Sequence, residues 1–303
     1  MKYKLIIIRY GEIALKGNAT RRHFENILVR NIKTALNTKH INHIIRKEWG
    51  RIFVYTDQTN ESIDVIKRIF GITSISPSLK ATANIDDISD FAIKISKENL
   101  TKEKSFALRV TRTGKHEFTS NGVAIKIGND IVNVTHAKVD LDTPDFELFI
   151  EIRNENTYFF TKKIRGIGGM PQGTQGKALA LIDKPESILA AWYLIRRGCK
   201  VIFLIKDKFN ISILKSFISR WYLDTSIYTS DFKENIYYIL YKKSNEENCD
   251  AVVTGHFLDE NLSATLSDIT QLKRHVNSLI LHPLIAMGKN EINIKCGEIG
   301  ISI

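Results

Sequence analysis

A glycine-rich stretch at residues 166–176 constrains the fold more than any other feature of this sequence. Its eleven residues include five glycines and Pro171. Glycine costs conformational entropy inside a helix or strand, and proline removes a backbone donor, so the stretch predicts a linker between separate parts of the chain. The pattern of apolar residues also changes across it, which predicts different folds on its two sides.

The half before the linker predicts two small α+β units, one at residues 1–75 and one at 76–165. Short isoleucine-rich runs indicate strands, and apolar residues at helical spacing indicate helices. Residues 71–80 contain Pro77 and predict a connector between the units. The elements predicted for this half are strands at 3–9, 41–46, 51–55, 106–111, 146–152 and 157–164, and helices at 20–36 (capped by Thr20), 63–70, 85–100 and 118–133.

The half after the linker, residues 177–303, alternates predicted strands with predicted helices. Strands are expected at 177–182, 200–205, 225–229, 250–254 and 279–281, with helices at 187–197 and 232–247 among those between them. Such alternation predicts a parallel sheet covered by helices on both faces. Ligands of these sheets bind beyond the carboxyl ends of the strands, so the loops after residues 182 and 254 are the candidate sites.

The positive charge of the chain is concentrated before the linker. The whole chain carries a net charge of +11. Residues 1–170 hold 28 basic and 19 acidic residues, whereas residues 171–303 hold 16 and 14. A basic first half is expected if that half contacts nucleic-acid phosphates, and a merely basic soluble surface is the alternative.

Composition excludes several classes of protein. No apolar run reaches the roughly 18 residues of a membrane span, and no signal peptide is visible, so we expect a cytoplasmic protein without membrane contact. Cys199, Cys249 and Cys296 are widely separated and form no CxxC or Cys/His cluster. We therefore predict no metal site, and we assign no catalytic role to any of these cysteines.

Basic residues of the first half are the candidates for RNA binding. A group around Gly114 lies at the end of one predicted strand, and others lie near the N-terminus and before the linker. Duplex RNA is recognised through its shape, phosphates and 2′-hydroxyls, which requires cations on rigid elements. The alternative is that several of these side chains are solvated or paired within the protein. The predicted RNA-binding residues are Arg9, Lys16, Arg21, Arg22, Arg109, Arg112, Lys115, Lys163 and Arg165.

Ordered motifs along the chain resemble the tRNA 4-thiouridine synthetase (ThiI-like) family. The run Arg9-Tyr10-Gly11-Glu12-Ile13 with Leu15-Lys16-Gly17 resembles the family's opening, and Val139-Asp140-Leu141 with Glu151-Ile152 resembles its THUMP domain. The most specific stretch, Gly166-Ile167-Gly168-Gly169-Met170-Pro171 with Gly173-Thr174 and Gly176-Lys177, resembles the GxGGLPxGTxGK link into the catalytic domain.

The resemblance implies a fold and an activity. It implies an N-terminal ferredoxin-like α+β domain, a THUMP domain, and a C-terminal PP-loop-type (adenine nucleotide alpha hydrolase-like) parallel α/β domain. In the family the first two bind the acceptor region of tRNA, while the third uses ATP and Mg²⁺ to adenylate a uridine that sulfur then attacks. The family's rhodanese-like domain, present in some members, has no counterpart before Ile303.

The family's nucleotide motifs are altered in this sequence. Where the family has SGGxDS after an apolar strand, residues 182–187 read Ile-Asp-Lys-Pro-Glu-Ser. Side chains in place of glycines obstruct a phosphate-binding backbone turn, and Pro185 lacks an N–H. In the later TGExxGQVxSQT motif, His256 replaces the glutamate and Asp259 the glycine; in RPLIGMDK, His282 replaces the arginine. The remnant nucleotide-binding residues are Lys184, Glu186, Ser187, Thr254 and Gly255.

Three functional hypotheses remain open on this sequence. The first is a tRNA-binding family member whose PP-loop is impaired in adenylation, serving a sulfur-carrier or modification-enzyme partner. The second is an active tRNA sulfurtransferase that makes 4-thiouridine with an external sulfur donor, with ATP and Mg²⁺ as cofactors only if the divergent PP-loop still works. The third is a non-catalytic RNA-binding interaction protein. The resemblance also implies a homodimer as one assembly.

Overall fold

The chain forms two compact units in its computed structural model, which describes residues 3–206, 209–230, 235–258, 265–276 and 278–302. The first unit comprises residues 1–9, 40–67 and 74–165. The second comprises residues 10–39, 68–73 and 166–303. The predicted domain boundaries at 75/76 and 165/166 stay predictions.

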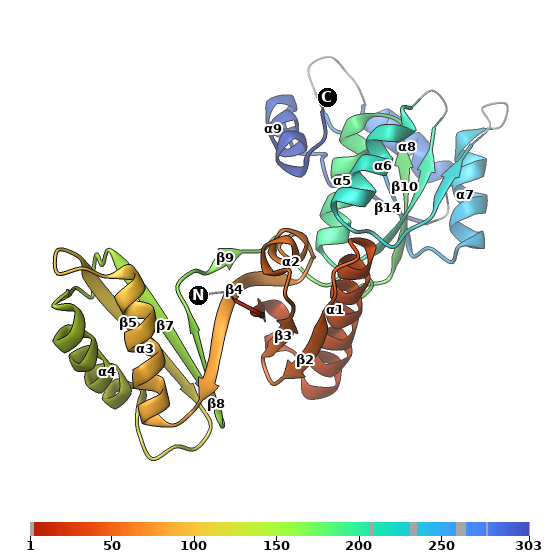
Figure 1. Cartoon of the computed structure of the whole chain (residues 1–303). Coiled ribbons are helices and arrows are strands. Elements are labelled where there is room, and N and C mark those ends of the chain that lie inside the picture. The colour runs from red at the N-terminus through yellow and green to blue at the C-terminus, as the bar shows by residue number, and fades with distance from the viewer. Residues whose placement is uncertain (1–2, 207–208, 231–234, 259–264, 277, 303) are drawn as a thin grey trace. The chain divides into compact units, whose positions relative to one another are not determined.

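The strands before the linker form one nine-stranded sheet (Figure 1). Its order is β2-β3-β1-β4-β8-β7-β5-β6, and β9 pairs with β4. β1 and β3 are antiparallel, whereas β5 and β7 are parallel with Arg109 opposite Phe149. The strands are β1 (Leu5–Tyr10), β2 (Ile44–Glu48), β3 (Arg51–Tyr55), β4 (Ile72–Thr82), β5 (Ser105–Thr113), β6 (Lys138–Val139), β7 (Phe146–Arg153), β8 (Asn156–Phe160) and β9 (Ile164–Arg165).

Three helices belong to the first unit: α2 (Thr59–Ile66), α3 (Ile85–Asn99) and α4 (Ser120–Thr135). α3 and α4 pack their apolar sides on β5 and β7 around Phe106, Ile131 and Ile150. The hydroxyl of Thr119 accepts a hydrogen bond from the N–H of Gly122 at 3.0 Å, which satisfies a donor of the first turn of α4. Thr119 is therefore the N-cap of α4.

The predicted connector at residues 71–80 is wrong, because these residues lie in the long strand β4. Buried Ser76 and Ser78 supply the inward-facing positions that apolar residues fill in the other strands. Pro77 lies between them and is only partly buried. A proline surrounded by serines is typical of a turn in sequence, but here the pairing of Lys80 with Tyr158 and the pairing of Ser74 with Arg165 keep the segment extended.

The second unit contains a five-stranded sheet in the order β12-β11-β10-β13-β14, in which all neighbouring strands are parallel. This confirms the predicted parallel sheet. The strands are β10 (Lys177–Ile182), β11 (Lys200–Ile205), β12 (Ile227–Thr229), β13 (Ala251–Val253) and β14 (Leu279–Leu281).

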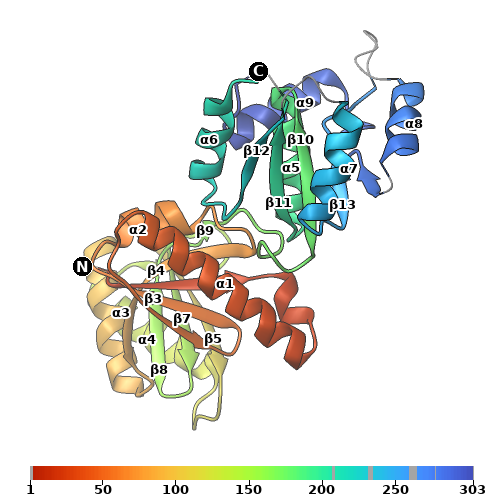
Figure 2. The same cartoon turned by 90° about the vertical axis from the view of Figure 1, so that its right-hand side faces the viewer.

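Helices cover both faces of this parallel sheet, as Figure 2 shows for α6 and α7. On one face α5, α6 and α9 bury an apolar core that includes Trp192, Phe203 and Phe217. On the other face α7 and α8 bury Leu240 and Leu272 against Leu204. The helices are α5 (Pro185–Arg196), α6 (Ile211–Arg220), α7 (Ile236–Glu246), α8 (Leu266–His275) and α9 (Lys289–Ile299).

By its contacts, the first long helix, α1 (Asn18–Thr38), belongs to the second unit, as does the 3-10 turn η1 (Glu12–Leu15). The predicted cap at Thr20 is wrong, since Gly17 occupies the N-cap with an extended backbone. Glycine is tolerated at this position because it leaves the first N–H groups accessible to water.

The glycine-rich stretch is held firmly against the end of α5. The N–H of Met170 donates to the carbonyl of Arg196 at 2.9 Å. Gly169 has φ +76°, and a Cβ there would lie 2.2 Å from the same carbonyl oxygen. Only glycine allows this close approach, so the linker is a fixed entry into the parallel domain. No helix in the described part of the chain is long and apolar enough to cross a membrane.

Candidate RNA and nucleotide sites

Residues of the turn after β10 form hydrogen bonds with one another. Lys184 is the N-cap of α5, and Pro185 occupies the first helical position, where its missing N–H costs nothing. The N–H of Ser187 donates to the carbonyl of Lys184 at 3.1 Å, and the Ser187 hydroxyl donates to Oδ1 of Asp183 at 2.6 Å. The serine that matches the family motif therefore has both its N–H and its hydroxyl bonded within the turn.

Glu186, one of the two carboxylates at this turn, has a cation beside it. Nζ of Lys289 lies 2.5 Å from Oε1 of the buried Glu186. Burial favours the neutral acid, but the hydrogen bond and charge of Lys289 hold the pKa of Glu186 below its usual value. The ammonium groups of Lys184 and Lys289 lie 4.8 and 5.3 Å from the ring centroid of Phe257. The two lysines thus contact the same aromatic ring.

The fold brings the two predicted nucleotide-binding segments together. Gly255 follows β13 and packs on Ser187: a Cβ at Gly255 would lie 2.6 Å from both Cα and Oγ of Ser187. Gly255 therefore serves a tight contact between the loop after β13 and the start of α5. Asp259, named for its motif position, lies outside the described residues.

Two histidines that replace charged family residues lie beside Thr254. Its buried hydroxyl is 2.7 Å from Nδ1 of His282 and 3.2 Å from Nδ1 of His256. The two rings are stacked with centroids 5.6 Å apart. Burial, with a smaller contribution from His256, lowers the pKa of His282. Lys289 is the last residue of the segment that resembles RPLIGMDK. No pattern in the sequence predicts its pairing with Glu186.

The cysteines of the second unit are poor nucleophiles. Burial raises the pKa of Cys296 to about 12 and that of Cys249 to about 11, and it also raises the pKa of Cys199. The thiolate is the reactive form, so these thiols stay protonated near neutral pH. Among the described residues, no group of three His, Cys, Asp or Glu side chains could hold a metal ion.

The predicted RNA-binding residues of the first unit form two groups. Arg112 and Lys115 are exposed at the end of β5, where Nη1 of Arg112 lies 3.2 Å from Nδ1 of His116. Nε2 of His116 is 2.6 Å from the carbonyl of Asn154, and its ring stacks on Phe118. These contacts fix the loop, so its cations lie on a rigid element.

The second group lies over two aromatic rings. The guanidinium of Arg9 is 4.6 Å from the Phe160 ring centroid, and Nζ of Lys163 is 4.0 Å from that of Phe149. Arg9 also pairs with the buried Glu151 at 3.1 Å. Arg109 pairs with Glu147 at 2.7 Å, while Arg165 is exposed on β9.

Three predicted RNA-binding residues belong to the second unit. Lys16 and Arg22 are exposed, at the end of η1 and in the first turns of α1. Arg21 donates to Oδ1 of Asn18 at 2.7 Å and lies 4.0 Å from Glu25. Their role in RNA binding, like that of the residues in the first unit, stays a prediction.

Sequence reasoning missed two basic residues of the first unit. Nε of Arg51 and Nη1 of Arg153 lie 2.7 and 3.1 Å from Oε1 of Glu151. The available signal was strand alternation: Phe149, Glu151 and Arg153 occupy every second position of β7, so they share one face. Charged residues in line with a core phenylalanine indicate a buried ion-pair network.

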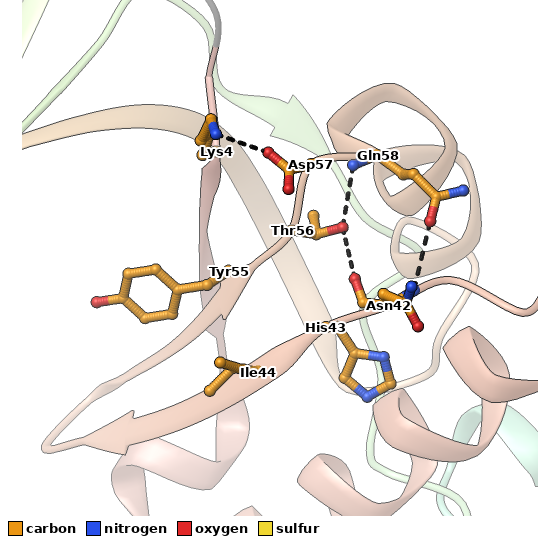
Figure 3. Close-up of a pocket in the computed structure, with 8 residues that line it drawn as sticks. All are labelled: Lys4, Asn42, His43, Ile44, Tyr55, Thr56, Asp57 and Gln58. Atoms are coloured by element: carbon orange, nitrogen blue, oxygen red, sulfur yellow. Dashed lines mark hydrogen bonds and ion pairs between the residues drawn. The ribbon is translucent and has the colours of Figure 1, made fainter.

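A separate hollow of about 540 Å³ opens near the start of β2 (Figure 3). Tyr55 and Ile44 lie on one side of it, and Lys4 pairs with Asp57 at 2.9 Å on its rim. The hydroxyl of Thr56 donates to the carbonyl of Asn42 at 2.8 Å. These polar groups bond to one another and tie the ends of β2 and β3 together, which is a structural role.

Family models match most of the chain. A model described as ThiI ferredoxin-like domain matches residues 5–76, one described as THUMP domain matches residues 82–162, and one described as Thiamine biosynthesis protein (ThiI) matches residues 226–302. These matches agree with the predicted fold classes of the two α+β units and of the parallel domain.

Curated relatives and solved structures are similar over nearly the whole chain. A probable tRNA sulfurtransferase of Methanothermobacter thermautotrophicus is 33% identical over 99% of this chain and 85% of its own length. That of Methanocaldococcus jannaschii is 34% identical over 97% and 87%. The crystal structure of PH1313 from Pyrococcus horikoshii matches with a TM-score of 0.84 and 29% identity, over 98% of this chain and 100% of that one. A 4-thiouridine synthetase–RNA complex with bound ATP shares the fold, with a TM-score of 0.83 and 23% identity, over 98% and 85%.

Proposed function

The chain belongs to the tRNA sulfurtransferase family, and from this premise we propose that it binds tRNA while its PP-loop domain is impaired in ATP-dependent adenylation. In this proposal the ferredoxin-like and THUMP domains bind the acceptor region. The parallel domain keeps the family fold and has lost much of its phosphate-binding backbone. The partner that would use the bound tRNA and the homodimer stay predictions.

Tight binding of tRNA is supported by the placement of cations on rigid elements. Arg112 and Lys115 lie on a loop that His116 holds to Asn154, and Lys163 lies over Phe149. Cations fixed in this way lose little side-chain entropy when they meet phosphates. The solved relative of the same fold was crystallised with RNA, which makes RNA the ligand class to test here.

Impaired nucleotide binding is supported by the turn after β10, and this is the observation that carries the proposal. A triphosphate needs several backbone N–H groups that point at it and small residues around them. In this turn Pro185 has no N–H, the N–H of Ser187 donates to Lys184, and the Ser187 hydroxyl donates to Asp183. The carboxylates of Asp183 and Glu186 would also repel phosphate oxygens. These residues do not fit the family's phosphate cradle.

An active sulfurtransferase is the alternative that one observation favours. The ammonium groups of Lys184 and Lys289 both lie over the ring of Phe257, so two cations are close to the former phosphate site. If they bind a nucleotide, the sulfur must come from an external donor, because burial raises the pKa of all three cysteines. The third hypothesis, a general RNA-binding interaction protein, predicts no preference for tRNA.

The direct test is binding of fluorescently labelled tRNA by anisotropy, with a duplex RNA of equal length as competitor. We expect tight, salt-sensitive binding of tRNA and weaker binding of the duplex. Equal affinity for both RNAs would favour the general RNA-binding protein. Incubation of the same protein with tRNA, Mg·ATP and sulfide should yield no 4-thiouridine by its absorbance, and formation of 4-thiouridine would overturn the proposed impairment.

A further inference from the structure

The buried carboxylate of Glu151 is surrounded by arginines from three strands of the first unit. Arg51 and Arg153 bond to Oε1 at 2.7 and 3.1 Å, and Arg9 bonds to Oε2 at 3.1 Å. Only 6% of the Glu151 side chain is exposed, compared with 13% of Arg9 and 7% of Arg153. One negative charge therefore meets three positive charges away from bulk water.

A fourth cation extends this cluster. Phe149 and Phe160 are stacked with ring centroids 5.1 Å apart, and Lys163 and Arg9 lie over these two rings. Burial first and the charge of Arg9 second lower the pKa of Lys163, whereas Glu147 and Glu151 act in the opposite direction. Burial likewise lowers the pKa of Arg9, although an arginine cannot lose its proton in a protein.

Carboxylates near the cluster do not balance its charge. Glu147 pairs with Arg109 at 2.7 Å and also raises the pKa of Lys163, so we count Glu147 and Arg109 together as a neutral pair beside the cluster. Glu48 lies opposite Arg51 in the β2–β3 register, and its charge is one of the causes that raise the pKa of Tyr158. Counting Glu48 with Glu151, four cations still face two carboxylates. A buried surplus of charge is unfavourable unless another ion compensates it.

Two donors in the cluster are also unsatisfied. Within the described residues, Nε of Arg153 and the hydroxyl of Tyr158 have no hydrogen-bond partner. Tyr158 is fully buried and stacks on Phe53 with ring centroids 4.8 Å apart. Buried donors without partners indicate a ligand or water that the protein atoms do not provide.

We propose that the Glu151 cluster, defined by Arg9, Arg51, Arg153, Lys163 and Glu151, is a binding site for a phosphate-type oxyanion. Arginines bind phosphate oxygens through paired donors, and two of the cations lie over the stacked rings of Phe160 and Phe149. The occupant is either a backbone phosphate of RNA or free phosphate. The RNA source rests on the proposed function, whereas the site itself does not.

The test is titration of the full chain with inorganic phosphate, followed by ³¹P NMR at constant ionic strength. We expect saturable binding that weakens at least tenfold in Arg51→Gln and at least threefold in Lys163→Gln. Arg46→Gln and Lys102→Gln are the matched controls, because Arg46 lies over Tyr55 and Lys102 pairs with Glu103, both outside the cluster. We expect the controls to bind within twofold of the wild type. Circular dichroism checks that each variant folds, and Lys163 is exposed, so its substitution leaves the core intact.

A second arm identifies the source of the phosphate. If tRNA displaces inorganic phosphate, and Arg51→Gln weakens tRNA binding, the occupant is an RNA phosphate. If phosphate binds but tRNA does not displace it, the occupant is a free anion. Absence of saturable phosphate binding, together with equal tRNA affinity of Arg51→Gln and Arg46→Gln, would overturn the site and leave tRNA binding intact. Phosphate binding without tRNA binding would instead overturn the proposed function.

Discussion

Two charged clusters, one in each unit, differ in how their charges are balanced. Around Glu151 three arginines share one buried carboxylate, and Lys163 lies beside them. At the turn after β10, Lys289 is matched by Glu186, and Asp183 accepts from Ser187 next to Lys184. The first cluster has positive charge left for an anionic ligand, whereas the second is close to neutral by itself. The number of cations near a site therefore does not predict anion binding unless the carboxylates paired with those cations are also counted.

The largest effect should follow from removing the shared carboxylate of the first cluster. We expect Glu151→Gln to lower the free energy of unfolding by about 3–5 kcal/mol, because it leaves buried arginines without a counter-charge. Urea unfolding at pH 7 measures this. Glu147→Gln is the control, because its pair with Arg109 is more than one third exposed and should be worth about 1 kcal/mol or less. Equal losses in the two variants would contradict the buried network.

The same variant predicts a pH dependence. Burial raises the pKa of Glu151, but Arg51 and Arg9 outweigh it and leave the pKa below its usual value. Because the pKa of Glu151 is lowered in the folded state, its ionised carboxylate stabilises the protein at pH values above the ordinary glutamate pKa of about 4.3. This stabilisation is lost as the pH falls through the pKa of the folded state. The stability gap between the wild type and Glu151→Gln should therefore narrow below about pH 4.

A smaller loss is expected in the balanced cluster. Lys289→Met removes the partner of buried Glu186, and we expect the free energy of unfolding at pH 7 to fall by about 2 kcal/mol. The loss should shrink in acid, since Lys289 contributes to the lowered pKa of Glu186. The matched control is Lys295→Met on the same helix, whose partner Glu298 is exposed. A loss no greater than that of the control would show that the Lys289–Glu186 pair stabilises the fold no more than an exposed pair does.

The smallest effect should be on RNA affinity at the rigid loop after β5. We expect Arg112→Ala with Lys115→Ala to weaken tRNA binding about tenfold and to reduce the salt slope by about 1–2, because each phosphate contact contributes about 0.9. Lys97→Ala with Lys102→Ala, at the end of α3, is the control. An unchanged salt slope would remove the loop from the RNA surface, and tRNA binding would then depend on other cations.

Most of the fold could be predicted from apolar spacing. The parallel sheet and its flanking helices follow from short apolar runs that alternate with amphipathic segments, and the cores around Trp192 on one face and Leu240 on the other confirm that both faces are covered. β4 could not be predicted, because Ser76 and Ser78 fill its inward positions and Pro77 is typical of a turn. Small polar residues give no periodic hydrophobic signal, so only tertiary pairing makes this segment a strand.

The candidate sites were harder to predict than the fold. The meeting of Ser187 with Gly255 follows from the rule that strand ends of a parallel sheet share one edge. The pairing of Arg9 with Glu151 joins residues 142 positions apart, and no local pattern in the sequence contains that information. Arg9 was predicted as an RNA contact from its charge and its position in the sequence. Arg9 is largely buried over Phe160, so the contacts that Arg9 makes within the protein limit which ligands it can bind.

Calorimetric titration with Mg·ATP, with and without tRNA, tests the central claim most directly. Ser187 donates both its N–H and its hydroxyl to residues of the turn after β10, so we expect no saturable heat at millimolar ATP, while tRNA binds the same sample tightly. Saturable ATP binding in either condition would contradict it. The chain would then be an active sulfurtransferase whose altered turn still binds the nucleotide.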